Sequence, residues 1–192
     1  MPRNKEFEYE EKLEKARDLF WEKGYHATSI HDIVDRMGLN RSSVYNSYGN
    51  KQQLFLKCLE SYAALKATQY RHAGKNAPSA FEALSFTIRD VVEQTMKDKK
   101  ACLIVRTVFE LGNEEPAISS FIKKNAEVLE SIFRELVIKA KAEGELKNEA
   151  SPDMLARYIL TTCSSFYMRY VLTGNKKEVN EMIDFLIGSL RK

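Results

Sequence analysis

Residues 24–60 read GYHATSIHDIVDRMGLNRSSVYNSYGNKQQLFLKCLE, and this stretch contains the most specific structural signals of the chain. Ser29, with Asp32 three residues later, has the form of a capping box and predicts the start of a helix. Thr28 is the alternative cap. Gly38 ends this helix, because glycine tolerates the positive φ that a tight turn between two helices demands. The stretch therefore begins with a short helix and a glycine turn.

The segment after the turn predicts an unusually polar helix. Asn40 is a good N-cap for a helix from Arg41 to about Ser47. Val44 is its one plainly aliphatic residue, so filling a core is not its main role. A short apolar helix, a glycine turn and a polar helix together predict a helix-turn-helix. The outward positions of the polar helix carry Arg41, Ser42, Ser43, Asn46 and Ser47, with Tyr45 and Tyr48 among them.

A polar second helix of this kind is suited to reading DNA. It enters the major groove, about 12 Å wide, with its N-terminal residues against base edges. Arg41 is suited to guanine and Asn46 to adenine, and the two serines suit a base or a phosphate. Tyr45 and Tyr48 suit a thymine methyl or a phosphate oxygen. The alternatives are that these tyrosines pack under the next helix and that Arg41 is an ordinary solvated charge.

The positions of the charged residues support nucleic-acid binding more strongly than the net charge does. The formal net charge of +3 is small, and up to Glu60 ten basic residues are matched by ten acidic ones. From Arg36 to Leu59 there is no acidic residue. A surface that touches phosphates needs a local absence of repelling charge. The basic residues of this acid-free segment are Arg36, Arg41, Lys51 and Lys57.

Helical periodicity covers the rest of the chain. The chain has only 8 glycines and 4 prolines, and strand-like alternation is scarce. We therefore predict an all-α protein of about nine helices, with an N-terminal three-helix head, a long fourth helix and a C-terminal helical bundle. The predicted divisions are residues 1–50, 51–73 and 74–192. The predicted helices span about 5–23, 30–37, 41–47, 51–72, 101–111, 116–144, 152–173 and 175–191, and the fifth in order begins at Pro78 with an apolar stripe that reaches Val91.

Several classes of protein are not expected. Cys58, Cys102 and Cys163 are odd in number and widely spaced, so they do not predict a disulfide framework or a metal site, and a redox role stays open. The N-terminus lacks the apolar stretch of a signal peptide, and no apolar run approaches the roughly 18 residues that span a bilayer. We expect a cytoplasmic protein without metal, cofactor or membrane association.

Catalytic groups are also not expected. His26, His31 and His72 are scattered, without the spacing of a metal site or a catalytic base. Ser120 and Lys123 fit a Ser-x-x-Lys pattern, but its companion motifs are missing. There is no glycine-rich phosphate loop. We therefore predict that the protein is not an enzyme and has no catalytic residues.

The chain from about Leu19 to Glu60 resembles the N-terminal signature of the TetR family of transcriptional regulators. The shared features are Thr-Ser-Ile at the entry to the second helix, Asp-Ile within it, the glycine turn, Val-Tyr, and Asn-Lys-x-x-Leu. The remainder is similar only in architecture. The resemblance implies a sequence-specific DNA-binding regulator, usually a repressor released from a palindromic operator by a small-molecule ligand. Activation is the other mode, and a helical small-molecule-binding or interaction module without DNA binding is the alternative function.

The resemblance assigns roles to particular residues. Thr28 and Lys51 match positions that contact phosphates, and Tyr45 matches a tyrosine that contacts backbone or base. The base-reading start of the recognition helix matches Arg41, Ser42 and Ser43. The family often has a smaller residue at position 43 and histidine-phenylalanine at positions 47 and 48. Ser47 here removes one possible phosphate contact.

A ligand cavity among the fifth to eighth helices is also implied by the resemblance, and such pockets are typically apolar with a few polar anchors. The alternatives are that the aromatic residues there are ordinary core and that Arg106 and Glu110 form a surface ion pair of little energy. The candidate ligand residues are Phe86, Arg106, Phe109, Glu110, Phe166 and Tyr167.

Small side chains at residues 161–165 permit close helix contact, and the last helix has a clean apolar stripe. We expect a homodimer through the last two helices, forming a four-helix interface across a two-fold axis. Packing within one subunit is the alternative. A dimer would place two recognition helices one DNA turn, roughly 34–36 Å, apart. Ligand binding that shifts the fourth helix would change this separation and release the DNA.

Overall fold

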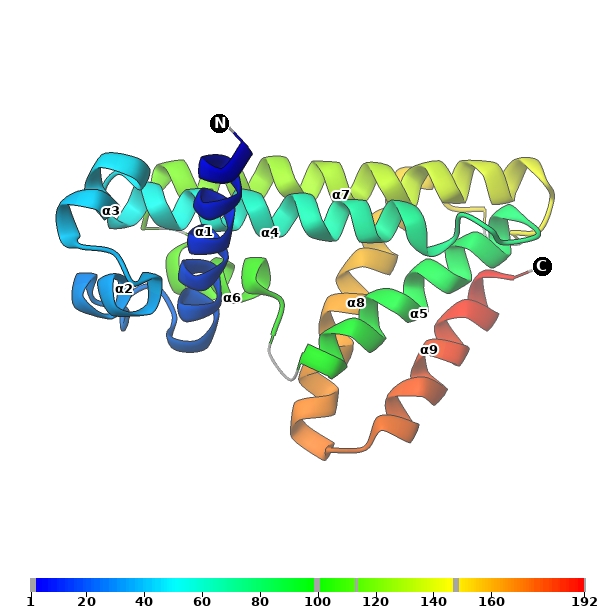
Figure 1. Cartoon of the computed structure of the whole chain (residues 1–192). Helices are drawn as coiled ribbons and strands as arrows, with labels where there is room; N and C mark the ends of the chain where they lie inside the picture. Colours follow the sequence, from blue (N-terminus) through cyan, green and yellow to red (C-terminus); the bar gives the residue numbers. More distant parts are fainter. Residues whose placement is uncertain (1–2, 99–100, 113, 147–148, 192) are drawn as a thin grey trace. The chain divides into compact units, whose positions relative to one another are not determined.

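The computed structural model describes residues 3–98, 101–112, 114–146 and 149–191, and these residues form nine helices (Figure 1). Their only strand-like feature is an isolated antiparallel bridge between Leu146 and Arg191. The predicted all-α class is confirmed. The helices are α1 (Arg3–Lys23), α2 (Ile30–Met37), α3 (Arg41–Tyr48), α4 (Lys51–Ala73), α5 (Ala80–Asp98), α6 (Leu103–Leu111), α7 (Pro116–Ala142), α8 (Pro152–Thr173) and α9 (Lys176–Leu190).

The chain folds into two compact units, to which α4 and α7 both contribute. The first, which we call the head unit, comprises residues 1–65 and 103–122, and the second, the body unit, comprises residues 66–102 and 123–192. The helix α6 thus groups with the N-terminal helices, whereas the sequence placed it in the C-terminal bundle. Its hydrogen bonds to the end of α1, described below, account for the difference.

The core of the head unit forms where α1, α2, α3 and α4 turn their apolar faces inward. Phe20 of α1 meets Phe55 of α4 edge to face, with ring centroids 4.8 Å apart. The thiol of Cys58 donates a hydrogen bond to the carbonyl of Leu13. These contacts join α1 to α4. The buried side chains of these four helices include Leu13, Ala16, Phe20, Ile33, Met37, Val44, Leu54, Phe55, Cys58 and Leu59.

In the body unit, α5 packs against α8 and α9, and α8 packs against α9 (Figure 1). Phe133 of α7 is fully buried there and meets Tyr70 of α4 edge to face. Exposed ion pairs such as Arg89 with Asp184 join the helices at the surface, and such pairs contribute little stability. The apolar core therefore holds this unit together. It includes Leu84, Ile88, Phe133, Val137, Ile159, Ile183 and Leu186.

The cysteines form no disulfide: Cys58 and Cys163 are buried and Cys102 is half-buried. Burial raises the pKa of the Cys163 thiol to about 12 and that of Cys58 further still. Both thiols are therefore protonated, and thus unreactive, at neutral pH. None of the described helices is long and apolar enough to cross a membrane. Among the described residues, no group of three or more His, Cys, Asp or Glu side chains could hold a metal ion.

Candidate nucleic-acid interface

The start of α2 has a complete capping box. The Ser29 hydroxyl accepts a hydrogen bond from the Asp32 amide at 3.1 Å, and the Asp32 carboxylate accepts one from the Ser29 amide at 2.8 Å. Lys23 of α1 pairs with the same carboxylate at 2.5 Å. Hydrogen bonds from Lys23 and Ser29 hold the pKa of Asp32 well below its usual range. The entry to the helix-turn-helix is thus fastened to α1.

The turn and the start of α3 have the conformation that the sequence predicts. Gly38 has a left-handed backbone, with φ of 61°, where a side chain would cost about 1–2 kcal/mol. The side-chain oxygen of Asn40 accepts a hydrogen bond from the Ser43 amide at 2.8 Å and so caps α3. Both helices of the motif therefore begin at a capped, defined residue.

One face of α3 is open and polar. Val44 and Tyr48, four residues apart, point into the core, and Ser43 is half-buried. The guanidinium of Arg41 lies 5.6 Å from the centroid of the Tyr45 ring, which is a cation–π contact between residues one helical turn apart. Such a contact orders two long side chains before any partner arrives. The exposed side chains are Arg41, Ser42, Tyr45, Asn46 and Ser47.

Lys51, at the first residue of α4, is held by an aromatic ring. Its ammonium lies 4.4 Å from the centroid of the Tyr25 ring, and Tyr25 packs in turn on Phe55, with ring centroids 5.0 Å apart. Partial burial lowers the pKa of Lys51 from its ordinary value, and the carboxylates of Glu110 and Asp32 oppose this shift. The positive charge that the sequence assigns to a phosphate contact therefore has a defined position.

Two of the predicted DNA contacts are not available in this structure. Thr28 is 0% exposed, and its hydroxyl donates a hydrogen bond to the Gly24 carbonyl at 2.5 Å. Tyr48 is 2% exposed, its ring stacks on Tyr9 with centroids 4.5 Å apart, and its hydroxyl donates to the Tyr9 carbonyl at 2.9 Å. Burial raises the pKa of Tyr48 to about 12. We correct the prediction by removing Thr28 and Tyr48 from the interface.

Lys57 is a candidate that the sequence analysis missed. It lies with Tyr45, Asn46 and Gln53 around a surface depression of about 420 Å³ between α3 and α4, which Glu60 also lines. The signal in the sequence was its place six residues after Lys51 in the acid-free segment. Arg36, by contrast, pairs with Glu22 of α1 at 2.7 Å, so its charge is already compensated.

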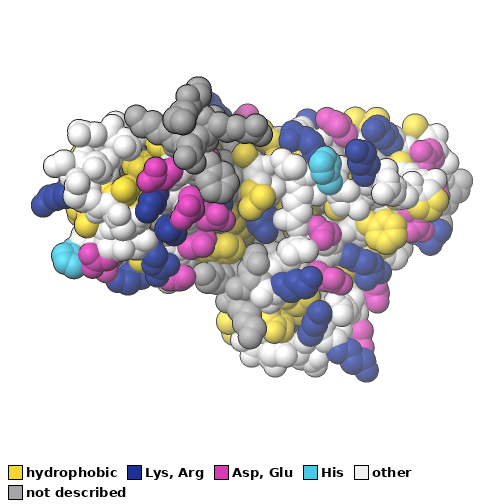
Figure 2. All heavy atoms as spheres, in the orientation of Figure 1, with side chains coloured by type: hydrophobic (Ala, Val, Ile, Leu, Met, Phe, Trp, Pro, Cys, Tyr) yellow, Lys and Arg dark blue, Asp and Glu magenta, His cyan; other side chains and the backbone are white. Residues whose placement is uncertain are grey.

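Charges of both signs alternate on the outer surface of α1. Lys15 pairs with Glu11 and Arg17 with Glu14, and Figure 2 shows acidic and basic side chains interspersed over this helix. The head unit is therefore not uniformly basic. The positive charge available to DNA is concentrated at α3 and the start of α4.

Arg106 and Glu110 of α6 bind the backbone where α1 ends. The Arg106 guanidinium donates a hydrogen bond to the Trp21 carbonyl at 2.7 Å, and the Glu110 carboxylate accepts one from the His26 amide at 2.8 Å. Gln52 of α4 also donates a hydrogen bond to Glu115, which follows α6. The first two bonds tie α6 to the end of α1 and to the loop that leads into α2 (Figure 1).

The six residues predicted to bind a ligand are divided between the units. Arg106, Phe109 and Glu110 belong to the head unit, where Phe109 is 88% exposed. In the body unit Phe86 is about half exposed, Tyr167 is half-buried and Phe166 is buried in the core. Phe166 also lines a groove of about 380 Å³ between α8 and α9. Neither unit alone contains the predicted set.

A capped α2, a left-handed glycine turn and an open polar α3 define a helix-turn-helix transcriptional regulator. Residues 13–58 match the family described as "Bacterial regulatory proteins, tetR family", and residues 81–186 match "Tetracyclin repressor-like, C-terminal domain". The chain belongs to the TetR family, and it is a DNA-binding regulator of transcription.

Relatives and solved structures agree with this assignment. The chain is 29% identical to the uncharacterized HTH-type transcriptional regulator YezE of Bacillus subtilis, over 99% of this chain and 100% of YezE. It is 28% identical to the HTH-type transcriptional repressor ComR of Escherichia coli, over 82% of this chain and 76% of ComR. A TetR-family regulator, CifR, solved with 26-base-pair operator DNA, has a TM-score of 0.78 at 22% identity, covering 93% of this chain and 94% of CifR.

Proposed function

We propose that the open face of α3 reads the bases of a palindromic operator while lysines at α4 bind phosphates. The main evidence is that α3, a helix capped at Asn40, buries only Val44 and Tyr48 and leaves most of its polar side chains exposed. Its N-terminal residues match the geometry in which a recognition helix meets base edges. The proposed base-reading residues are Arg41, Ser42, Ser43, Tyr45 and Asn46, and the proposed phosphate contacts are Lys51 and Lys57.

The regulator acts as a repressor that a small molecule releases from its operator. The relative ComR is named a transcriptional repressor, and this name supports the repressor mode for the present chain. The body unit holds a cleft of about 530 Å³, within the usual size of ligand pockets. A protein that binds chromosomal operators acts in the cytoplasm of a bacterial cell.

Two copies of the chain form a dimer through α8 and α9, and the dimer binds one operator. Large apolar side chains are exposed along these two helices, with Phe185 80% exposed. Contiguous exposed apolar surface marks a protein interface in most soluble proteins. A two-fold dimer presents two copies of α3 to two half-sites, which matches a palindrome. The exposed apolar residues are Met154, Tyr158, Met168, Val171, Leu172, Met182 and Phe185.

Selection of genomic fragments by the purified protein tests the DNA-binding surface. We expect wild-type protein to enrich one palindromic sequence, and Arg41→Ala and Tyr45→Ala to lose it. Lys15→Ala is the matched control, because Lys15 is a basic residue of the same unit that pairs with Glu11 and is not part of the proposed interface. If Lys15→Ala loses the site as completely as Arg41→Ala, the assignment of the α3 face is wrong.

The alternative function, a helical module without DNA binding, makes the opposite prediction. Wild-type protein would then enrich no sequence, even at low salt, where phosphate contacts are strongest. Palindromic enrichment by wild-type protein rejects this alternative.

A further inference from the structure

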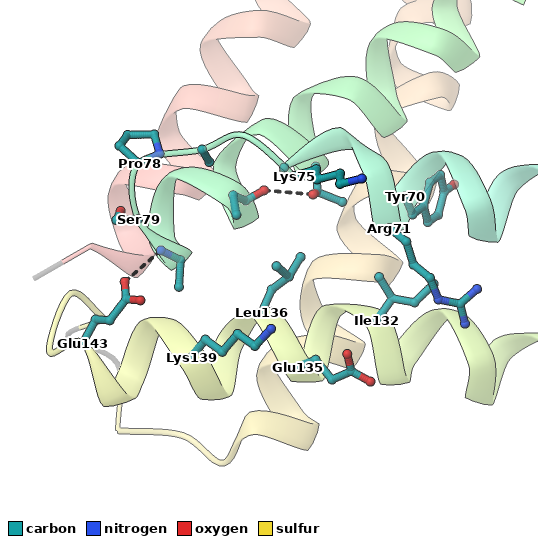
Figure 3. A pocket seen from close by; sticks show the side chains of 15 residues that line it. Tyr70, Arg71, Lys75, Pro78, Ser79, Ile132, Glu135, Leu136, Lys139 and Glu143 are labelled. Carbon is teal, nitrogen blue, oxygen red and sulfur yellow. Dashed lines mark hydrogen bonds between the residues drawn. The ribbon is translucent and has the colours of Figure 1, made fainter.

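A cleft in the body unit brings together cations from two helices that lie far apart in the sequence (Figure 3). It lies between the end of α4, the loop at residues 74–79, the first turns of α5 and the last turns of α7, and its volume is about 530 Å³. Arg71 and Lys75 come from α4 and its following loop, and Lys139 comes from α7. None of the residues predicted from sequence to bind a ligand lines it.

The three cations of the cleft have no carboxylate partner within ion-pair distance among the described residues. Arg71, Lys75 and Lys139 are all exposed, whereas other basic residues of the body unit are paired, such as Arg134 with Asp153 at 2.5 Å. Unpaired cations that share one cleft repel each other. An anion bound between them removes this repulsion and gains charge-assisted hydrogen bonds.

Two acidic residues, Glu135 and Glu143, line the cleft beside these cations. Glu143 accepts a hydrogen bond from the Ala80 amide at 2.8 Å, and Glu145, just outside the cleft, accepts one from the Phe81 amide at 3.2 Å. These carboxylates cap the start of α5, where negative charge is favoured by the helix dipole. Glu135 is the other carboxylate of the lining, so three cations face two carboxylates, one of which already caps α5, and the cleft carries a net positive charge.

Part of the inner surface of the cleft is apolar. Tyr70 and Ile132 are buried side chains of its lining, and Leu136 projects between them and Lys139 (Figure 3). The buried hydroxyl of Thr87 already donates to the Ala83 carbonyl at 2.8 Å. An apolar body would bury against this surface while its charged end meets the cations at the rim.

We propose that this cleft binds an organic anion, a carboxylate or phosphate carried on an apolar body, and that this anion is the effector. The inference rests on the proposed function as a ligand-released repressor, and it adds the chemical class of the ligand and the residues that select it. Arg71 comes from α4 and Lys139 from α7, so the cations that select the anion lie on two different helices of the cleft lining (Figure 3).

Fluorescence titration with two probes tests the site. Anilinonaphthalene sulfonate is an apolar anion, and phenylnaphthylamine is a neutral molecule with the same rings. In the double variant Arg71→Gln/Lys139→Gln we expect the Kd of the anion to rise about tenfold or more, as loss of charge-assisted bonds predicts, with the Kd of the neutral probe unchanged. Lys123→Gln/Lys124→Gln is the matched control, since it removes two exposed cations of α7 outside the cleft.

The same titration distinguishes the two kinds of anion. Phenylbutyrate and phenylbutyl phosphate compete with the sulfonate probe, and the stronger competitor identifies the preferred head group. Phenylbutyramide, which is neutral, is expected not to compete. Competition by the amide equal to that by the two anions would show an apolar site without charge selection and would overturn the proposal. So would equal weakening of the sulfonate probe in the cleft and control double variants.

Operator binding, measured with and without phenylbutyl phosphate or phenylbutyrate, separates this inference from the proposed function. We expect the better competitor to weaken operator binding by wild-type protein and to leave binding by Arg71→Gln/Lys139→Gln unchanged. If wild-type protein selects an operator but neither anion binds the cleft, the inference fails and the regulator assignment stands. If the anions bind but no operator is selected, the proposed function fails.

Discussion

The ammonium of Lys51 lies 4.4 Å from the centre of the Tyr25 ring, and Tyr25 is itself packed against Phe55 of the head core. A cation above an aromatic face is attracted by the ring quadrupole, by roughly 0.5–1 kcal/mol at an exposed site. The ring thus restricts a flexible side chain before DNA binds. Tyr25 is therefore a positioning residue for the proposed phosphate contact.

Replacing Tyr25 tests this role. We expect Tyr25→Leu to weaken operator binding about two- to fivefold, the loss that a cation–π contact of this strength predicts. Tyr25→Phe keeps the ring and is expected to bind as wild type does. In the Lys51→Ala background Tyr25→Leu should have no further effect on DNA affinity, as a double-mutant cycle by fluorescence anisotropy would measure. Additive losses would show that Tyr25 affects DNA affinity independently of Lys51.

The roles of Arg41 and Lys57 differ in a way that binding assays can separate. Arg41, at the start of α3, is expected to contact a base, so Arg41→Ala should cost about 1–3 kcal/mol and relax the preference at one operator position. Lys57→Ala should instead weaken binding to all sequences and lower the salt slope by about 1. Uniform weakening by Arg41→Ala would reassign that residue to the phosphate backbone.

Gly24 lies where α6 meets the end of α1. Its φ is 89°, and an added Cβ would come within 2.9 Å of both the Arg106 guanidinium and the Glu110 carboxylate. Gly38, with φ of 61°, has its nearest such neighbour, the Lys12 ammonium, at 3.6 Å. Both positions carry the backbone penalty, but Gly24→Ala would also displace the ends of the Arg106 and Glu110 side chains, which bond the Trp21 carbonyl and the His26 amide.

We therefore expect Gly24→Ala to lower the free energy of unfolding of the head unit by more than Gly38→Ala does. Urea unfolding followed by the fluorescence of Trp21, the one tryptophan of the chain, measures both variants. Equal losses would mean that the contact between α6 and the α1 end contributes no stability to the head unit.

The helix-turn-helix could be predicted from sequence because its determinants are local. The bond from the Asp32 amide to Ser29 and that from the Ser43 amide to Asn40 each span three residues, and Gly38 ends α2 by its own backbone preference. Such signals need no knowledge of the rest of the chain.

The errors arose where distant residues decide the outcome. Tyr48 is buried because Tyr9, 39 residues earlier, supplies both a ring and a carbonyl to it. Likewise, α6 joins the head unit through the bond from Arg106 to Trp21, 85 residues apart. Periodicity identifies a buried face but does not say which helix covers it. The cation cleft was missed for the same reason.

The buried thiol of Cys163 makes stability depend on pH at alkaline values. Its pKa is raised from 9.0 to about 12 by burial, so the folded thiol stays protonated while the unfolded thiol ionises. Above pH 9 the unfolded state therefore binds fewer protons, and stability falls as pH rises toward the folded pKa. We expect the Tm to fall less steeply above pH 9 in Cys163→Ala than in wild type. Identical slopes would show that the thiol ionises equally in both states.

Phe185 of α9 is 80% exposed, on the outer side of a groove that Tyr158 and Met182 also line. Exposing a large apolar side chain to water is unfavourable in free energy. Burial of this side chain against a second copy of the chain would remove that cost. A charge placed there would have to be desolvated on dimerisation. We therefore expect Phe185→Lys to be a monomer with a normally folded body unit, in sedimentation velocity and circular dichroism.

The monomer should also lose operator binding, although α3 is untouched. One recognition helix makes half of the contacts, and linked half-sites bind far more tightly than either alone. Asp184→Lys is the control, because Asp184 is an exposed neighbour whose side chain pairs with Arg89 of the same chain at 2.5 Å. It adds a positive charge to α9 and should remain dimeric. A dimeric Phe185→Lys, or a monomer that still binds the full palindrome with wild-type affinity, would place the subunit interface elsewhere.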